Sequence, residues 1–125
     1  MKLMTLSEKQ QWFARMTVED LFPWIFAQGC EFTYGEIWRP HETEVLYQKE
    51  GKSELKPNQT SIHELKMAAD LNIFKNGVLL QALADYLPFG QYWEGLSNPT
   101  LGIVCCWGGR WGDADHFSFE HEGIK

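Results

Sequence analysis

One segment in the second half of the chain predicts a β-hairpin, and this feature constrains the fold more than any other. Residues 69–73 alternate between apolar and polar side chains, as in a strand with one buried face. A turn over 75–77, which contains the dipeptide Asn-Gly, and an apolar run over 78–80 follow directly. An antiparallel sheet is therefore expected at the centre of the fold.

Helical patterns flank this hairpin. Residues 5–29 predict two short helices: the first has a capping box from Ser7 to Gln10, and the second begins at Thr17 and ends at Gly29. The remaining expectations are a strand at 31–37, a helix at 41–48, an exposed loop at 51–59, a helix at 82–96 broken at Pro88, a loop at 107–113 and a strand at 116–120. Together they predict an α+β fold, a small antiparallel sheet with flanking helices.

Size and charge narrow the class of protein further. A chain of 125 residues predicts one domain spanning 1–125, and 44% hydrophobic residues supply a core, which rules out intrinsic disorder. The net charge of -6 has the wrong sign for sequence-independent binding of nucleic acid or anionic lipid. We therefore expect no nucleic-acid partner and no membrane insertion.

The cysteines and the N-terminus bear on the compartment. Cys30, Cys105 and Cys106 are odd in number and include an adjacent pair, a poor basis for disulfides or a four-thiolate zinc site, so reduced thiols are expected. No apolar stretch is long enough for a signal peptide or a membrane span. The protein is thus expected to be synthesised in the cytoplasm, and any action elsewhere requires another route of release.

Two histidines lie near carboxylates in the sequence. His63 precedes the predicted strand that carries Asp70, and His116 follows Asp113 and Asp115. Imidazole and carboxylate ligands suit zinc, and three protein ligands leave a fourth position for water. From spacing alone, a histidine that forms a surface hydrogen bond with a carboxylate is the commoner arrangement. The residues by themselves leave both interpretations open.

A family resemblance favours the metal site. The segments Ser61-Ile62-His63 to Asp70 and Asp113-Ala114-Asp115-His116-Phe117 resemble the S-x-H-x(6)-D and D-x-x-H-F signatures of zinc D-Ala-D-Ala carboxypeptidases of the VanY type. These share a family with phage L-alanyl-D-glutamate endolysins. The similarity covers residues 34–120 and includes these further segments: Arg39-Pro40, Glu42, Leu46-Tyr47, Gly51-Lys52-Ser53, Phe89-Gly90, Tyr92-Trp93-Glu94 and Trp107-Gly108-Gly109.

The resemblance implies a hedgehog/DD-peptidase-like zinc peptidase fold and specific roles. His63, Asp70 and His116 would bind Zn2+, and Asp113 would be the general base. The family often has an uncharged residue just before its last histidine, and Asp115 stands there in this chain, which leaves open which carboxylate is the base.

Two further residues would contact substrate. Arg39 matches the family arginine that holds a substrate carboxylate through two parallel hydrogen bonds, and Ser61 would add a donor. Without the resemblance, the same residues would be a surface arginine in an ion pair and a serine that caps a turn.

The implied function is hydrolysis of peptidoglycan stem peptides by a phage or prophage endolysin that cuts the L-Ala to D-Glu bond. The alternatives are a D-Ala-D-Ala carboxypeptidase, which uses the same chemistry in a different pocket, and a non-enzymatic wall-binding or virion structural protein that retains the fold. An endolysin of this kind is expected to be a monomer that acts on the wall or periplasm after release, with a holin-like protein as the partner that opens the way.

Overall fold

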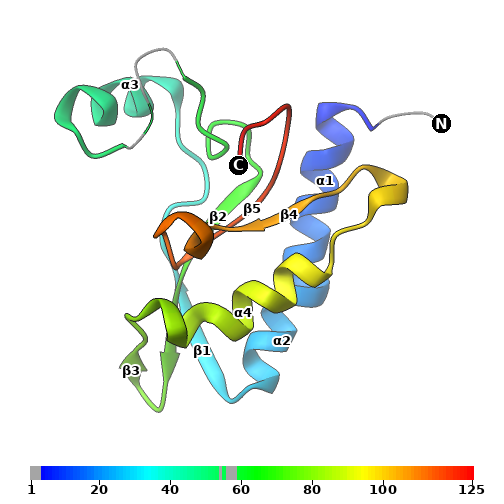
Figure 1. The fold of residues 1–125 in the computed structure, drawn as a ribbon, viewed down its shortest axis with the longest axis vertical. Helices are drawn as coiled ribbons and strands as arrows, with labels where there is room; N and C mark the ends of the chain where they lie inside the picture. The colour runs from blue at the N-terminus through cyan, green and yellow to red at the C-terminus, as the bar shows by residue number, and fades with distance from the viewer. Residues whose placement is uncertain (1–3, 54, 56–58) are drawn as a thin grey trace.

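A five-stranded antiparallel sheet forms the centre of the computed structural model, which describes residues 4–53, 55 and 59–125. The strand order is β1-β2-β5-β4, and β3 pairs with β2 (Figure 1). The strands are β1 (Cys30–Tyr34), β2 (Ala68–Lys75), β3 (Val78–Leu79), β4 (Cys105–Trp107) and β5 (His116–Phe119). The expected small antiparallel sheet is confirmed, with the strand predicted at 31–37 ending early, at Tyr34.

The predicted hairpin is the pair β2–β3. Lys75 pairs with Val78, so Asn76 and Gly77 form a two-residue turn, and both have positive φ (52° and 76°). This is the conformation that Asn-Gly adopts most readily, because its twist matches that of the flanking strands. The alternation along β2 also holds, since Leu71 and Ile73 are fully buried while the intervening residues are partly exposed.

Three helical segments cover one side of the sheet. They are α1 (Leu6–Met16), α2 (Phe22–Ala27) and α4 (Leu83–Gly95). Phe13 of α1 packs edge-on against Trp93 of α4 and Phe119 of β5, with ring centroids 5.8 and 5.2 Å apart. Such aromatic contacts, together with the burial of apolar surface, hold α1 and α4 against the sheet.

Helix α3 (His41–Glu50) lies apart from these helices, at the upper left of Figure 1. Glu44 is its one buried residue among those that the structure describes. The helix begins where predicted and extends two residues beyond the predicted end at 48. The loop predicted at 51–59 follows it, and residues 54 and 56–58 of that loop lie outside the described residues. Helix α3 therefore adds little to the core but stands beside the loops that form the site.

Several local predictions were wrong. Thr5, not Ser7, caps α1, and its hydroxyl accepts from the Glu8 amide (3.1 Å). Thr17 does not cap a second α-helix: its hydroxyl donates back to the Ala14 carbonyl (2.8 Å), and a π-helical segment, η1 (Thr17–Leu21), joins α1 to α2. Pro88 lies inside α4 without ending it.

The glycine-rich segment after β4 is partly ordered. Instead of the loop predicted over 107–113, it contains a short 3₁₀ helix, η3 (Gly108–Trp111). A second 3₁₀ helix, η2 (Pro99–Leu101), precedes β4. Of the two, η3 matters for the site, because it leads directly into the segment that carries Asp113 and His116.

Two remaining expectations concern sulfur and membranes. The three cysteines are free and buried, as expected for reduced thiols. Over the described ranges, no helix combines the length and apolar character that a membrane crossing requires.

Candidate metal centre

The sheet register places Asp70 and His116 together. Asp70 of β2 and His116 of β5 are direct partners in the antiparallel pairing, so their side chains lie on the same face. His63 comes from the tight turn before β2, in which the Ser61 hydroxyl accepts the His63 amide (3.1 Å). Residues that are far apart in sequence thus converge on one point, as the family resemblance implies.

The three side chains form a compact donor set. The Asp70 Oδ1 atom lies 3.4 Å from His63 Nε2 and 3.5 Å from His116 Nδ1. This oxygen is buried and has no hydrogen-bond partner among the described residues. One donor atom from each residue lies within 4.8 Å of the others, and the group could hold a metal ion.

The second nitrogen of His63 supports this arrangement. Its Nδ1 atom lies 3.1 Å from the Ile37 carbonyl oxygen, and a proton on Nδ1 makes this a hydrogen bond. That tautomer leaves the lone pair of Nε2 directed toward Asp70, which is how metal-binding histidines are commonly oriented. The buried, unpartnered Asp70 oxygen and the oriented imidazole therefore fit a bound cation.

Electrostatics favour an ionised Asp70. Burial alone would raise its pKa, but the imidazoles of His116 and His63 outweigh burial and lower the pKa to about 2. Burial in turn would lower the pKa of His63, yet Asp70 raises it overall. The cluster is thus built around a carboxylate that keeps its charge, as a metal ligand must.

The loop before β5 brings a second carboxylate to this cluster. Asp113 Oδ2 lies 3.7 Å from His116 Nδ1. Gly108 makes this approach feasible, because a Cβ atom there would lie only 2.4 Å from the Asp113 carbonyl oxygen and 2.6 Å from His116 Cβ. Trp107 secures the same loop by donating its indole N–H to the Ala114 carbonyl (2.7 Å).

Asp113 and Asp115 influence each other. Burial raises the pKa of Asp113, and the neighbouring Asp115 raises it further. The pKa of Asp115 is also raised, chiefly by burial. Their positions differ, since Asp113 lines the cavity described below and Asp115 is not among its described lining residues.

An open cavity of about 710 Å³ lies over the cluster. Its described walls include the residues predicted from sequence: Arg39, Ser61, His63, Asp70, Asp113 and His116. Lys52, Ser53 and Trp111 also line it. All six residues singled out by sequence reasoning therefore face one hollow of the molecule.

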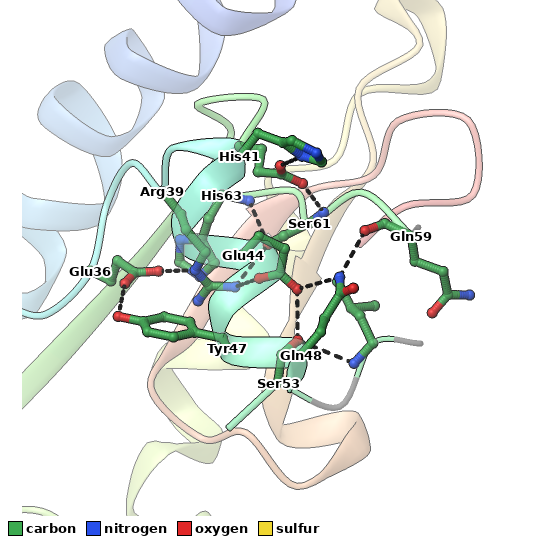
Figure 2. Close-up of polar contacts among 12 residues, drawn as sticks. Glu36, Arg39, His41, Glu44, Tyr47, Gln48, Ser53, Gln59, Ser61 and His63 are labelled. Carbon is green, nitrogen blue, oxygen red and sulfur yellow. Dashed lines mark hydrogen bonds and ion pairs between the residues drawn. The ribbon is translucent and has the colours of Figure 1, made fainter. Parts of the chain in front are cut away.

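Arg39 is already engaged in this structure. Its Nε atom donates to Glu36, and its Nη1 atom donates to Glu44 (2.6 Å) and to the Ser61 hydroxyl (3.2 Å) (Figure 2). Tyr47 stacks against the guanidinium, whose carbon lies 5.0 Å from the ring centroid. Sequence reasoning missed Glu36 and Glu44. The three-residue spacing of Glu36 and Arg39 was a local signal for the first, whereas nothing in the sequence marked Glu44 as buried.

Comparisons with known proteins bear on the fold. No family model matches this chain, and no curated protein sequence matches it. Among solved structures, the chain is similar to the L-Ala D-Glu endopeptidase ChiX of Serratia marcescens, with a TM-score of 0.62 and 20% sequence identity. The match covers 82% of this chain and 77% of that one. The chain therefore has the α+β fold of an L-Ala D-Glu endopeptidase.

Proposed function

We propose that this protein is a zinc-dependent peptidase that hydrolyses stem peptides of bacterial peptidoglycan. One observation carries the proposal: His63, Asp70 and His116 converge beneath an open cavity, on a fold that an L-Ala D-Glu endopeptidase shares. The bond proposed for cleavage is the one between L-Ala and D-Glu, in agreement with the sequence resemblance.

His63, Asp70 and His116 would hold the metal ion. Two imidazole nitrogens and one carboxylate oxygen form a donor set typical of catalytic zinc sites, which keep a further position open. When bound, zinc supplies a Lewis acid and a water of lowered pKa. The residues around it supply orientation: Ile37 holds His63 through Nδ1, and the β2–β5 pairing holds Asp70 opposite His116.

Asp113 is the proposed general base. Its side chain lines the cavity, about half exposed, and its Oδ2 atom lies close to the cluster without belonging to the His63–Asp70–His116 set. A carboxylate in that position can accept a proton from the attacking water and return it to the leaving amine. The spacing of Asp113 and His116 and the cavity lining support this role over one for Asp115.

Arg39 and Ser61 are the proposed substrate contacts. Both line the cavity, and stem peptides carry free carboxylates that a guanidinium binds well. Because Nε and Nη1 already donate to protein groups, Arg39 would offer its remaining nitrogen, Nη2, rather than a two-pronged edge. Phage or prophage origin, action on the wall after release, a holin-like partner and a monomeric state complete the proposal, and these rest on the family resemblance.

Digestion of purified wall fragments tests the proposal. Purified protein with zinc is incubated with wall fragments, and the products are identified by mass spectrometry. A new D-Glu amino terminus is expected from the wild type, none from His63→Ala, and an unchanged yield from His121→Ala, which lies outside the described lining. Free D-Ala as the sole product would favour the carboxypeptidase, and tight wall binding without cleavage would favour the structural protein.

A further inference from the structure

Glu44 is a buried carboxylate that the proposed reaction does not use. It lies on α3, a helix that contributes little to the core, yet its side chain is 0% exposed. A carboxylate removed from water in this way is costly unless charged partners and hydrogen bonds satisfy both oxygens. The contacts that Glu44 makes should therefore indicate why the residue is there.

Both oxygens of Glu44 are satisfied, and by different segments. Oε2 accepts from Arg39 Nη1 (2.6 Å). Oε1 accepts from the Ser53 hydroxyl (2.7 Å) and from Gln48 Nε2 (3.1 Å). Gln48 Nε2 also donates to the Gln59 carbonyl (3.1 Å). Figure 2 shows Glu44 at the centre of these contacts, which join α3 to Arg39 before the helix and to Ser53 after it.

The partners of Glu44 continue toward the metal cluster. The Arg39 nitrogen that meets Glu44 also donates to the Ser61 hydroxyl, and that hydroxyl accepts the His63 amide. The Ser53 hydroxyl likewise accepts the Leu55 amide (3.2 Å). Arg39, Ser53 and Ser61 all line the cavity. One buried side chain thus connects two residues of the cavity wall directly, Arg39 and Ser53, and a third, Ser61, through Arg39.

The charge state of Glu44 fits these contacts. Burial would raise the pKa of Glu44, but hydrogen bonds from Ser53, Gln48 and Arg39 outweigh it and hold the pKa below its usual range. An ionised carboxylate offers acceptors on both oxygens, whereas a glutamine amide would present a donor to groups that already donate. The network therefore requires a carboxylate, not merely a side chain of this size.

We propose that Glu44 is a positioning residue, which holds Arg39, Ser53 and Ser61 in place before a peptide enters the cavity. The part that concerns substrate rests on the proposed function. Side chains that are already held in place lose less conformational entropy when substrate binds. Loss of Glu44 should therefore weaken substrate binding more than it slows turnover. Glu44 does not itself line the cavity among the described residues, and it would act through its neighbours.

The test compares Glu44→Gln with Glu42→Gln, an exposed site on the same helix that loses the same charge. Amide hydrogen exchange is measured on the protein alone. In Glu44→Gln we expect exchange roughly tenfold faster at Leu55 and His63, with the β2 and β5 amides unchanged. With stem peptide, KM should rise roughly tenfold while kcat stays within about threefold. Glu42→Gln should match the wild type in both measurements.

Two results would overturn the inference. One is a Glu44→Gln variant with wild-type exchange at Leu55 and His63. The other is faster exchange throughout the chain, which would show a contribution to stability alone. Should Glu44→Gln fail to fold, Ser53→Ala, which removes one hydrogen bond to Glu44, must still speed exchange at His63, whose amide bonds to Ser61 and not to Ser53. A wild type that cleaves no peptide would contradict the proposed function but leave the exchange result to decide the role of Glu44.

Discussion

At the scale of single residues, the two neighbouring carboxylates before His116 show how position separates chemically identical groups. Asp113 lies at the cavity, 3.7 Å from His116, while the Asp115 backbone carbonyl accepts the Leu71 amide (2.9 Å) and so ties that residue to β2. The Asp115 carboxylate still lies within 4.8 Å of those of Asp70 and Asp113. Because a general base must reach a proton in the cavity, it is the cavity lining that favours Asp113 for the proposed role.

Replacing each carboxylate by its amide tests this assignment. Asp113→Asn should retain the metal and lose activity by roughly 10²-fold or more, because an amide cannot accept the proton. Asp115→Asn should retain both the metal and most of the activity. Metal content by elemental analysis and kcat/KM on stem peptide are the measurements. The opposite pattern, with Asp115→Asn inactive and Asp113→Asn active, would show that the motif register is wrong.

The sequence predicted which residues lie together at the candidate site better than it predicted their surroundings. His63, Asp70 and His116 were found through a motif, and the structure brings them together. For Arg39 and Ser61, the simpler interpretations also describe real contacts: Arg39 pairs with two carboxylates, and Ser61 caps the turn at His63. The sequence did not predict that Glu44 would pair with Arg39, because this contact depends on how α3 packs, and no local pattern encodes that packing.

At the scale of elements, predictions were correct where the controlling interactions are local. The Asn76-Gly77 turn is fixed by its own backbone preference, and β2 by its alternation. The sequence predictions failed where a residue can form either of two local hydrogen bonds. Thr17 can cap a helix forward or bond back to Ala14, and it does the latter. Pro88 is tolerated in α4, where Phe89 and Trp93 just after it are buried.

Helix α4 also offers a test of how the site loop is supported. A Cβ atom at Gly90 would lie 2.1 Å from the Trp107 ring, whereas one at Gly95, on the same helix, meets nothing within 4 Å. Gly90→Ala should therefore destabilise by about 1–3 kcal/mol despite the better helix propensity of alanine. Gly95→Ala should be neutral or stabilising. Chemical denaturation measures both.

The consequence of Gly90→Ala should extend to the metal centre. Trp107 holds the Ala114 carbonyl, so a displaced indole should loosen the segment that carries Asp113 and His116. We expect metal affinity to fall in Gly90→Ala and not in Gly95→Ala. If both variants proved equally stable and bound metal equally, the packing of α4 against Trp107 would not support the site.

At the scale of the whole molecule, the fold separates an apolar, stabilising side from the side that carries the candidate metal centre. Helices α1, α2 and α4 pack on the apolar face of the sheet, while the loops around α3 and the segment before β5 form the cavity. Conserving such a core needs only apolar residues of suitable size, which is consistent with a shared fold at 20% identity. The proposed chemistry would depend instead on a few side chains from separate elements.

The position of the candidate metal ligands predicts that metal binding stabilises the entire fold. His63, Asp70 and His116 join a turn to two central strands, and a metal that binds only the folded state adds its binding free energy to stability. Zinc at 100 times its Kd should add about 2.7 kcal/mol, a rise in Tm of roughly 10 °C for a chain of this size. His63→Ala should lose most of this gain, since the set of three ligands is then incomplete, while His121→Ala should retain it. Thermal denaturation with zinc and with excess chelator measures the difference. An equal rise in the wild type and in His63→Ala would place the bound metal elsewhere on the protein.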